Sequence, residues 1–157
     1  MDFRKMRRFK QQLSDEECVR ILTQEKRGVL ALIGDGGYPY AVPMDFVYDN
    51  GAVYFHSAKE GHKIDALSSC EKLSFCVVTK GEKPDEDWAY YVRSVIVFGR
   101  GRMISDDEEK ISALRLLGNK YYPSSQEVEE EILKDGDRAA VIALSIEHMT
   151  GKKVHEK

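Results

Sequence analysis

The junction between a predicted strand and a predicted helix holds Ser57, Gly61, His62 and Lys63, a set suited to binding an anion. The preceding residues 52–55 (AVYF) have the β-branched and aromatic content of a strand, and the residues that follow suit a short helix with one apolar side. The start of a helix presents unpaired N–H groups and the positive end of the peptide dipoles, so it can hold phosphate. The same residues also suit a solvated turn with two incidental basic side chains, and local chemistry leaves both interpretations open.

Two predicted hairpins lead into this junction. Residues 28–33 (GVLALI) have the pattern of a buried strand, residues 39–48 (PYAVPMDFVY) that of a second strand, and Asn50-Gly51 indicates a tight turn. Pro43 has no N–H to donate, so we expect the second strand to be bulged there or to lie at a sheet edge. Such an edge beside a phosphate site would offer free backbone groups to a planar ligand.

The remaining pattern predicts one mainly β domain, residues 1–157, with helices flanking a small barrel. Capping boxes that begin at Ser14 and Ser105 predict helices reaching about Glu25 and Lys120. Further strands are predicted at 73–79, 90–104 and 139–146, with Gly99 and Gly101 bending the long one, and a short acidic helix with a solvated face at 126–134.

Charge and composition exclude several classes of protein. The net charge of −3 argues against general nucleic-acid binding, and no apolar run approaches the roughly 20 residues that span a bilayer. Cys18, Cys70 and Cys76 match no zinc or redox spacing, and so predict reduced cysteines in a cytoplasmic protein. His56 and His62 do not form a recognised metal motif, so no metal site is predicted.

The sequence also shows no motif for strong nucleophilic or acid–base catalysis. Ser57 lacks the Gly-x-Ser-x-Gly frame of a nucleophile elbow, and Gly99-Arg100-Gly101 lacks the third glycine of a dinucleotide fingerprint. Redox chemistry remains open to such a chain, provided that a cofactor carries the reactive atoms.

Residues 42–67 (VPMDFVYDNGAVYFHSAKEGHKIDAL) resemble the flavin-binding split-barrel family related to pyridoxamine-phosphate oxidase, in particular the branch that includes nitroimidazole-resistance proteins. Residues 6–8 (MRR), Trp88, residues 91–95 (YVRSV) and residues 146–152 (IEHMTGK) are similar to that branch in the same order. The chain departs from the family after the paired arginines, where Phe-Lys-Gln follows, and at the C-terminal end, which has no arginine-containing phosphate motif. We therefore do not expect oxidation of vitamin B6.

The resemblance implies a homodimeric, Greek-key split β-barrel that binds FMN in a groove between its subunits. It further implies an oxidoreductase that acts on a small molecule, such as a nitroaromatic compound, with reduced nicotinamide as electron donor. The implied cofactor residues are Val42, Pro43, Met44 and Phe46 along the flavin ring, Ser57, Ala58, His62 and Lys63 at its phosphate, and Arg93 and Ser94 from the later strand. His56 would face the substrate as the candidate catalytic residue, or it would form a hydrogen bond that closes the mouth of the barrel.

Two alternatives come from other functional classes. In the first, a split-barrel protein handles haem, and one of His56, His62, His148 and His155 ligates the iron. In the second, the protein binds flavin without turnover, as a carrier or sensor. An absorption spectrum separates haem from flavin, and turnover of reduced nicotinamide separates an enzyme from a passive binder.

Overall fold

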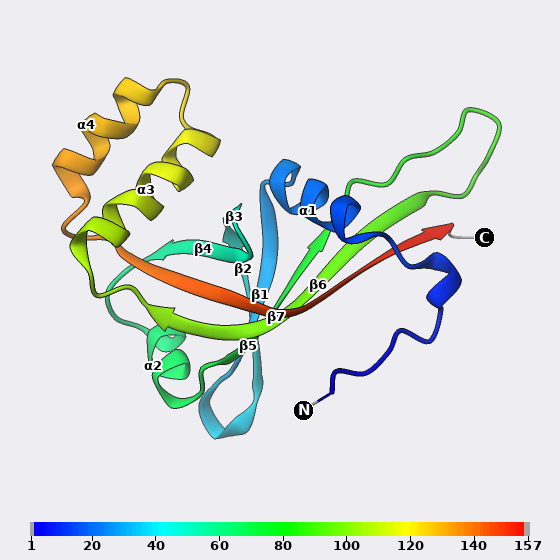
Figure 1. Cartoon of the computed structure of the whole chain (residues 1–157), viewed down its shortest axis with the longest axis horizontal. Helices are drawn as coiled ribbons and strands as arrows, with labels where there is room; N and C mark the ends of the chain where they lie inside the picture. The colour runs from blue at the N-terminus through cyan, green and yellow to red at the C-terminus, as the bar shows by residue number, and fades with distance from the viewer. Residues whose placement is uncertain (1, 156–157) are drawn as a thin grey trace.

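The computed structural model describes residues 2–155, which form a curled antiparallel sheet with helices at its ends (Figure 1). The elements in chain order are η1 (Phe9–Gln11), α1 (Asp15–Gln24), β1 (Arg27–Ile33), η2 (Asp35–Gly37), β2 (Pro39–Asp45), β3 (Val47–Asp49), β4 (Ala52–Ser57), α2 (His62–Ser69), β5 (Lys72–Val78), β6 (Tyr91–Met103), α3 (Asp107–Tyr121), α4 (Ser125–Asp135) and β7 (Ala140–His155).

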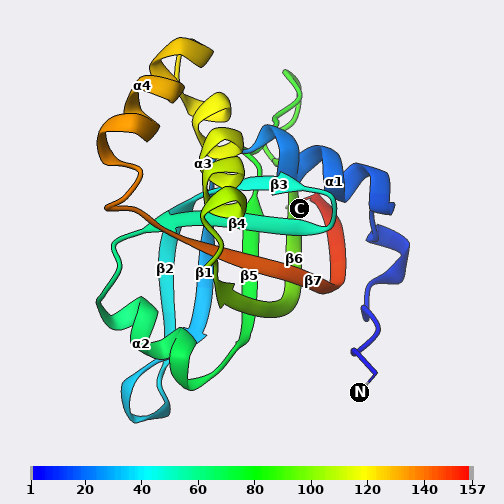
Figure 2. The ribbon, with the colours of Figure 1, turned by 60° about the vertical axis from the view of Figure 1, so that its left-hand side comes forward.

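The strand order β2-β1-β5-β6-β7-β4-β3 leaves the sheet open between its two edges. The long strand β7 pairs with β6 along its length and with β4 at its start, and so joins the two parts of the sheet. The curl brings β2 close to β4, but no hydrogen-bonded ladder connects them among the described strands (Figure 2). The result is a split barrel of the mainly β class that the sequence predicts.

Three phenylalanines fill the interior of the barrel. Phe75 on β5 meets Phe46 and Phe55 edge to face, with ring centroids 4.8 and 5.0 Å apart, and all three side chains are fully buried. The strands of Phe55 and Phe75 alternate buried and more exposed residues, as expected for a sheet with one face on the core. Burying each such ring contributes roughly 1.5–3 kcal/mol to folding.

The strand predicted at 39–48 is two strands, β2 and β3, because Phe46 interrupts the strand conformation. The ring of Phe46 enters the core, and its backbone N–H donates to the Tyr121 hydroxyl at 2.9 Å instead of extending the sheet. The predicted turn is confirmed, with Asn50 and Gly51 at φ 43° and 78°. Pro43 does lie on an edge strand, opposite Val29 of β1.

Other boundaries differ from the sequence predictions. The capping box at Ser14 is confirmed, whereas α3 is capped by Asp106 and not by Ser105, since the Asp106 carboxylate accepts from the Glu109 N–H at 2.8 Å. Helix α4 is not merely solvated: its Val128 is buried against Gly118 of α3, where a Cβ would lie 2.6 Å from the valine side chain. Strand β7 continues to His155, well beyond the predicted end at 146, because β6 remains available as its partner.

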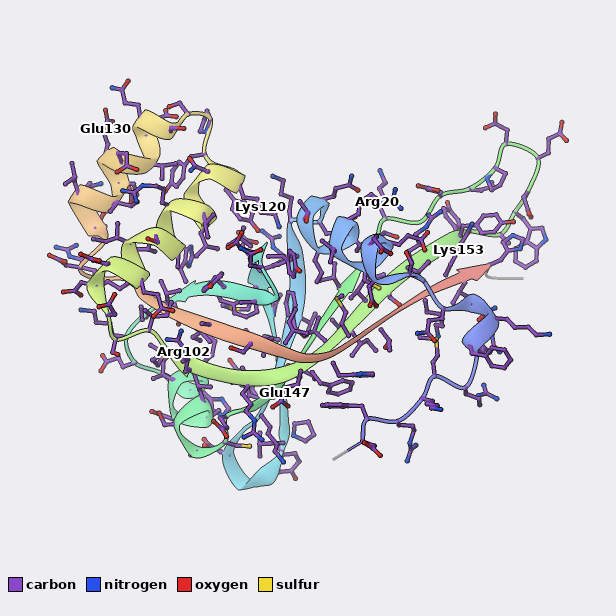
Figure 3. All side chains as sticks on the ribbon, in the orientation of Figure 1. Arg20, Arg102, Lys120, Glu130, Glu147 and Lys153 are labelled. Carbon is purple, nitrogen blue, oxygen red and sulfur yellow. The ribbon has the colours of Figure 1, made fainter. Side chains whose placement is uncertain are left out.

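A clasp of Lys120 (labelled in Figure 3) and Tyr121 fastens the end of α3 to the segments just before β1 and between β2 and β3. The Lys120 ammonium donates to the carbonyls of Glu25 and Phe46 at 2.5 and 2.9 Å and lies 3.9 Å from the centre of the Phe46 ring. The Tyr121 hydroxyl donates to the Lys26 carbonyl at 2.5 Å. Burial lowers the pKa of Lys120 to about 8, so the charged form that makes these bonds still predominates at pH 7.

Replacing Lys120 with methionine keeps the length of the side chain and removes its donors. We expect the free energy of unfolding to fall by about 2 kcal/mol, because bonds from a charged donor to half-buried carbonyls are lost. Urea denaturation measures the change. The matched control is Lys134→Met on α4, an exposed lysine, for which the change should stay within about 0.5 kcal/mol. Equal effects of the two variants would contradict a stabilising clasp.

Candidate functional site

A groove with a volume of about 840 Å³ opens at the split in the barrel, where the edge strand β2 faces the end of β4 and the start of α2. Strand β3 pairs with β4 only as far as Tyr54, so the last residues of β4 have no partner on that side. Both strands therefore present unpaired backbone to the groove. The residues that line it are Arg27, Tyr40, Pro43, Met44, Asp45, His56, Ser57, Ala58, Glu60, Gly61, His62 and Lys63.

The strand-to-helix junction predicted as an anion site forms one end of this groove. Gly61 has φ 124°, a conformation that favours glycine, and it precedes a helix whose first turn no side chain caps. By contrast, a serine or aspartate caps each of α1, α3 and α4. The first N–H groups of α2 are thus left for solvent or for a ligand.

Lys63 places a half-buried cation at the same end of the groove. Its ammonium lies 3.4 Å from the Met44 sulfur, a weak acceptor, and no carboxylate pairs with it in the described part of the chain. Burial lowers the pKa of Lys63, which shows that its charge is incompletely compensated. An anion in the groove would supply that compensation.

A ring contact and a backbone hydrogen bond hold His62 at the edge of the groove. Its ring stacks on Tyr40 with centroids 4.1 Å apart, and its Nε2 accepts from the Asp35 N–H at 3.3 Å. The Asp35 carboxylate is farther from the same nitrogen, at 3.8 Å, and is open to solvent.

Arg27 and Asp45 are groove residues that sequence reasoning missed. They face each other across the β1–β2 hairpin and form an exposed ion pair, with Nε and Oδ1 2.8 Å apart. The hairpin register could have revealed the pair, because the two residues are equally distant from its turn. Since Asp45 already neutralises Arg27, Lys63 remains the uncompensated cation of the groove.

Most of the predicted site residues meet in this groove, and four do not. Pro43, Met44, His56, Ser57, Ala58, His62 and Lys63 line it. The predicted place of Phe46 along the flavin ring is corrected, because its side chain is fully buried in the core. Val42 packs against that core and does not line the groove.

Arg93 and Ser94 are the other two, and within one subunit the structure does not bring them to the groove. Arg93 lies in a separate hollow with residues of α1, and its guanidinium is 3.3 Å from the Glu82 carboxylate. Ser94 pairs with Val78 of β5 and Lys152 of β7.

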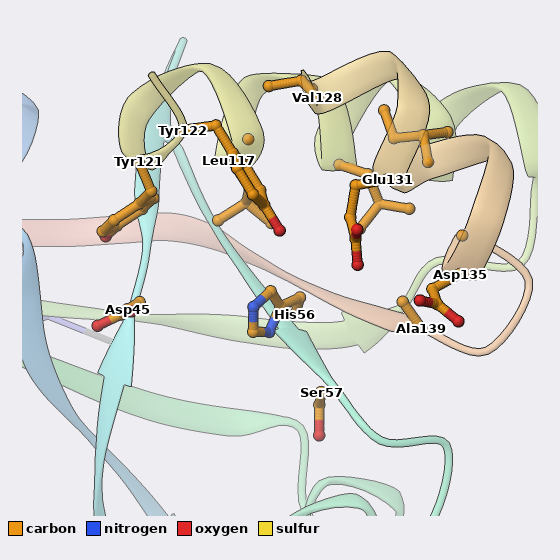
Figure 4. Close-up of a pocket in the computed structure, with 14 residues that line it drawn as sticks. Asp45, His56, Ser57, Leu117, Tyr121, Tyr122, Val128, Glu131, Asp135 and Ala139 are labelled. Carbon is orange, nitrogen blue, oxygen red and sulfur yellow. The ribbon is translucent and has the colours of Figure 1, made fainter. Parts of the chain in front are cut away.

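His56 stands between the groove and a second cavity of about 430 Å³, which α3 and α4 cover (Figure 4). Among the four histidines it alone has no hydrogen bond, ion pair or ring contact to residues 2–155. Its side chain is exposed, and nothing in the described part of the subunit shows a bond that closes the mouth of the barrel. The imidazole is therefore free to contact a ligand from either space.

The described residues contain no group of three histidine, cysteine or acidic side chains arranged to hold a metal ion. Within residues 2–155, none of the helices combines the length and apolar character needed to cross a membrane. The groove offers Lys63 and the start of α2 to an anion, and Ser57 and His56 for polar contacts.

Comparison with known protein families agrees with this geometry. Residues 14–153 match the model of the pyridoxamine 5'-phosphate oxidase family. The chain belongs to this family. The resemblance found in the sequence is thereby confirmed, whereas no curated protein gave a significant match.

Solved structures share the split barrel of this family member. A candidate 5-nitroimidazole antibiotic resistance protein from Bacteroides thetaiotaomicron is 25% identical, with a TM-score of 0.76 over 92% of this chain and 87% of that one. A FAD-binding protein from Mesorhizobium loti is 24% identical, with a TM-score of 0.69 over 91% and 96% of the two chains. A FAD- and heme-binding protein from Mycobacterium smegmatis is 21% identical, with a TM-score of 0.74 over 90% and 72%.

Proposed function

We propose that this protein is an FMN-dependent oxidoreductase that passes electrons from reduced nicotinamide to a small organic molecule. The observation that carries the proposal is Lys63, a half-buried ammonium without an anionic partner among the described residues, beside an uncapped helix start in a groove of about 840 Å³. The flavin bound by two of the structural relatives supports the choice of cofactor.

The residues of the groove fit a flavin with a single phosphate. Lys63, the first N–H groups of α2, the Ser57 hydroxyl and Nδ1 of His62 would hold the phosphate. The unpaired edge of β2 at Pro43 and Met44 would border the ring, which supplies hydride and electron transfer when bound. Asp45 and Glu60 also line the groove, and their charge disfavours a second phosphate, so FMN fits better than FAD.

Reversing the charge of Lys63 tests the phosphate site. Lys63→Glu should weaken FMN binding by about 1.5–3 kcal/mol, the size of a charge-assisted hydrogen bond, and should leave riboflavin binding nearly unchanged. Fluorescence titration of the flavin-free protein with both ligands measures this. Lys59→Glu, an exposed residue of the same loop that does not line the groove, is the matched control and should bind FMN like the wild type.

Equal losses of FMN and riboflavin would indicate misfolding and contradict the assignment. The absorption spectrum of the protein as purified, with mass spectrometry of the released ligand, provides the second check. A Soret band, or a released ligand without a flavin ring, would show that the cofactor is not FMN.

We also propose that the protein is a homodimer with the flavin between subunits. Five apolar side chains on the outer face of β1, β5 and β6 are each 40–55% exposed: Val29, Ile33, Val78, Ile96 and Phe98. The strand register makes them neighbours, since Cys76 lies between Val29 and Ile96 in adjacent strands. A continuous apolar sheet face of this kind is normally covered, and a second copy of the chain would cover it.

The dimer also gives Arg93 and Ser94 a place in the proposed site. In their own subunit they lie away from the groove, in the part of β6 near α1. They would instead contribute to the groove of the partner subunit, which would reconcile their position with the cofactor role that the resemblance implies.

A charge on the outer sheet face should separate the subunits. We expect Ile96→Glu to sediment as a monomer at micromolar concentration and to lose bound FMN, because two-fold symmetry would bury two like charges. Leu133→Glu on α4, where leucine is 87% exposed, is the control and should remain a flavin-loaded dimer. A wild-type monomer that carries FMN would refute the proposal.

His56 is proposed to contact the substrate or to exchange a proton with it. His56→Ala should retain FMN and lower turnover per bound flavin by roughly 10²–10⁴-fold, the usual effect of a positioned acid or base. Thermal stability should change little, since the imidazole makes no bond within the described chain. Flavin content, melting temperature and turnover are measured on one preparation. Unchanged turnover, or a stability loss of about 1–3 kcal/mol instead, would favour a structural role.

A further inference from the structure

The cavity between β4 and the α3–α4 pair, which we name the covered cavity, is continuous with the groove. Asp45, His56 and Ser57 line both spaces. The volume of the covered cavity, about 430 Å³, lies within the range of small-molecule pockets, roughly 300–1,000 Å³. A ring held at the His56 end of the cavity would therefore face a ligand in the groove.

The walls of the covered cavity suit a flat ring. Gly118 lets Val128 approach closely, so α4 packs directly on α3 and the two helices close the cavity together. The apolar and aromatic side chains that line it are Leu114, Leu117, Val128, Ile132, Tyr121 and Tyr122. Tyrosine rings stack on other flat rings, and their faces also attract a positive charge.

The charged side chains that line the covered cavity are acidic. Among the described residues no lysine or arginine lines it, whereas Asp45, Glu131 and Asp135 do. Asp45 pairs with Arg27, and Asp135 lies within 3.6 Å of two basic side chains of its own segment. Glu131 is different: it is half-buried, and no hydrogen bond or ion pair joins it to residues 2–155.

Glu131 faces His56 across the cavity (Figure 4). The Tyr122 side chain extends from α3 toward the same space, and its hydroxyl also has no partner in the described chain. A carboxylate without a partner thus lies beside a space suited to a ring. Such a carboxylate gains most from a ligand that carries, or acquires, a positive charge.

The electron donor of the proposed function acquires a positive charge as it reacts. Its dihydronicotinamide ring is neutral, and the reaction breaks the C4–H bond of that ring. The hydrogen leaves with both electrons and bonds to the oxidised flavin, so the ring becomes a pyridinium cation and the flavin gains the matching negative charge. A fixed negative charge beside the ring stabilises the cation and the transition state that leads to it.

From this geometry we infer that the covered cavity binds the nicotinamide ring of the electron donor, and that Glu131 stabilises the pyridinium cation formed when the ring gives up hydride. The tyrosines and leucines enclose the ring, and the Tyr122 hydroxyl bonds to its carboxamide. The phosphates of a dinucleotide stay outside, because the acidic lining repels them. This inference rests on the proposed function, from which it takes both the donor and the flavin.

Two probes of the same shape test the ring site. The 1-benzylnicotinamide cation carries the charge of the oxidised donor, and 3-benzylbenzamide is its neutral counterpart; calorimetric titration of the full-length protein as purified gives the affinity for each. We expect the cation to bind about tenfold tighter or more, the effect of one charge-assisted contact. Glu131→Gln should reduce this preference to less than about threefold. Glu130→Gln, an exposed residue that bonds to Gln126 and does not line the cavity, should retain it.

The reduced form of the first probe tests the transfer step. Mixed with the protein without oxygen, 1-benzyl-1,4-dihydronicotinamide should bleach the absorbance of the bound flavin, and Glu131→Gln should slow the bleaching about tenfold or more. The flavin content of Glu131→Gln should equal that of the wild type, because Glu131 lies outside the groove. Glu130→Gln should be bleached at the rate of the wild type.

The flavin content of each sample separates this inference from the proposed function. Equal affinity of the wild type for the two probes would overturn the inference and leave the flavin proposal standing. A preference for the cation, or a bleaching rate, that survives Glu131→Gln would do the same. Purified protein that neither carries nor takes up flavin would refute the proposed function, and the transfer step with it, whichever probe it binds more tightly.

Discussion

The gap that the sheet leaves between β2 and β4 is the constraint on which the rest of the structure depends. Unpaired strand edges need a partner, and here Pro43 on one edge and the end of β4 on the other face the same groove. Phe46, Phe55 and Phe75 fill the interior of the barrel, and none of them lines the groove. The proposed ligand site therefore lies at the rim of the barrel, outside the filled core.

Two helices bring side chains of opposite charge to the two sides of His56. Helix α2 brings Lys63 and free N–H groups to the groove, while α4 brings Glu131 to the cavity that α3 and α4 cover. Phe46 links these sides, because it enters the core and its carbonyl accepts from Lys120 beneath α3. The interruption between β2 and β3 at Phe46 therefore ends the strand that borders the groove and also anchors the end of α3.

Local signals in the sequence predicted most of the elements and the location of the groove. Alternating apolar residues, the Asn50-Gly51 turn and the capping box at Ser14 act over short distances, so the sequence pattern displays them directly. The break at Phe46 depends on Tyr121, 75 residues away, and the residues of β7 beyond 146 are too polar to signal a strand. Glu131 looked like part of a solvated acidic face, because nothing local indicates that α4 covers a cavity.

The position of β7 in the sheet also sets the order in which the protein can fold. It is the last strand of the described chain, yet β4 and β6 both need it as a neighbour. During synthesis, the edge of β4 that pairs with β7 must therefore stay unpaired until α3 and α4 have emerged. Pairings between distant segments form slowly and leave apolar surface exposed meanwhile. A nascent chain that stalls after α4 would present an unpaired, aggregation-prone hairpin, which makes completion of β7 the step that commits the chain to its native state.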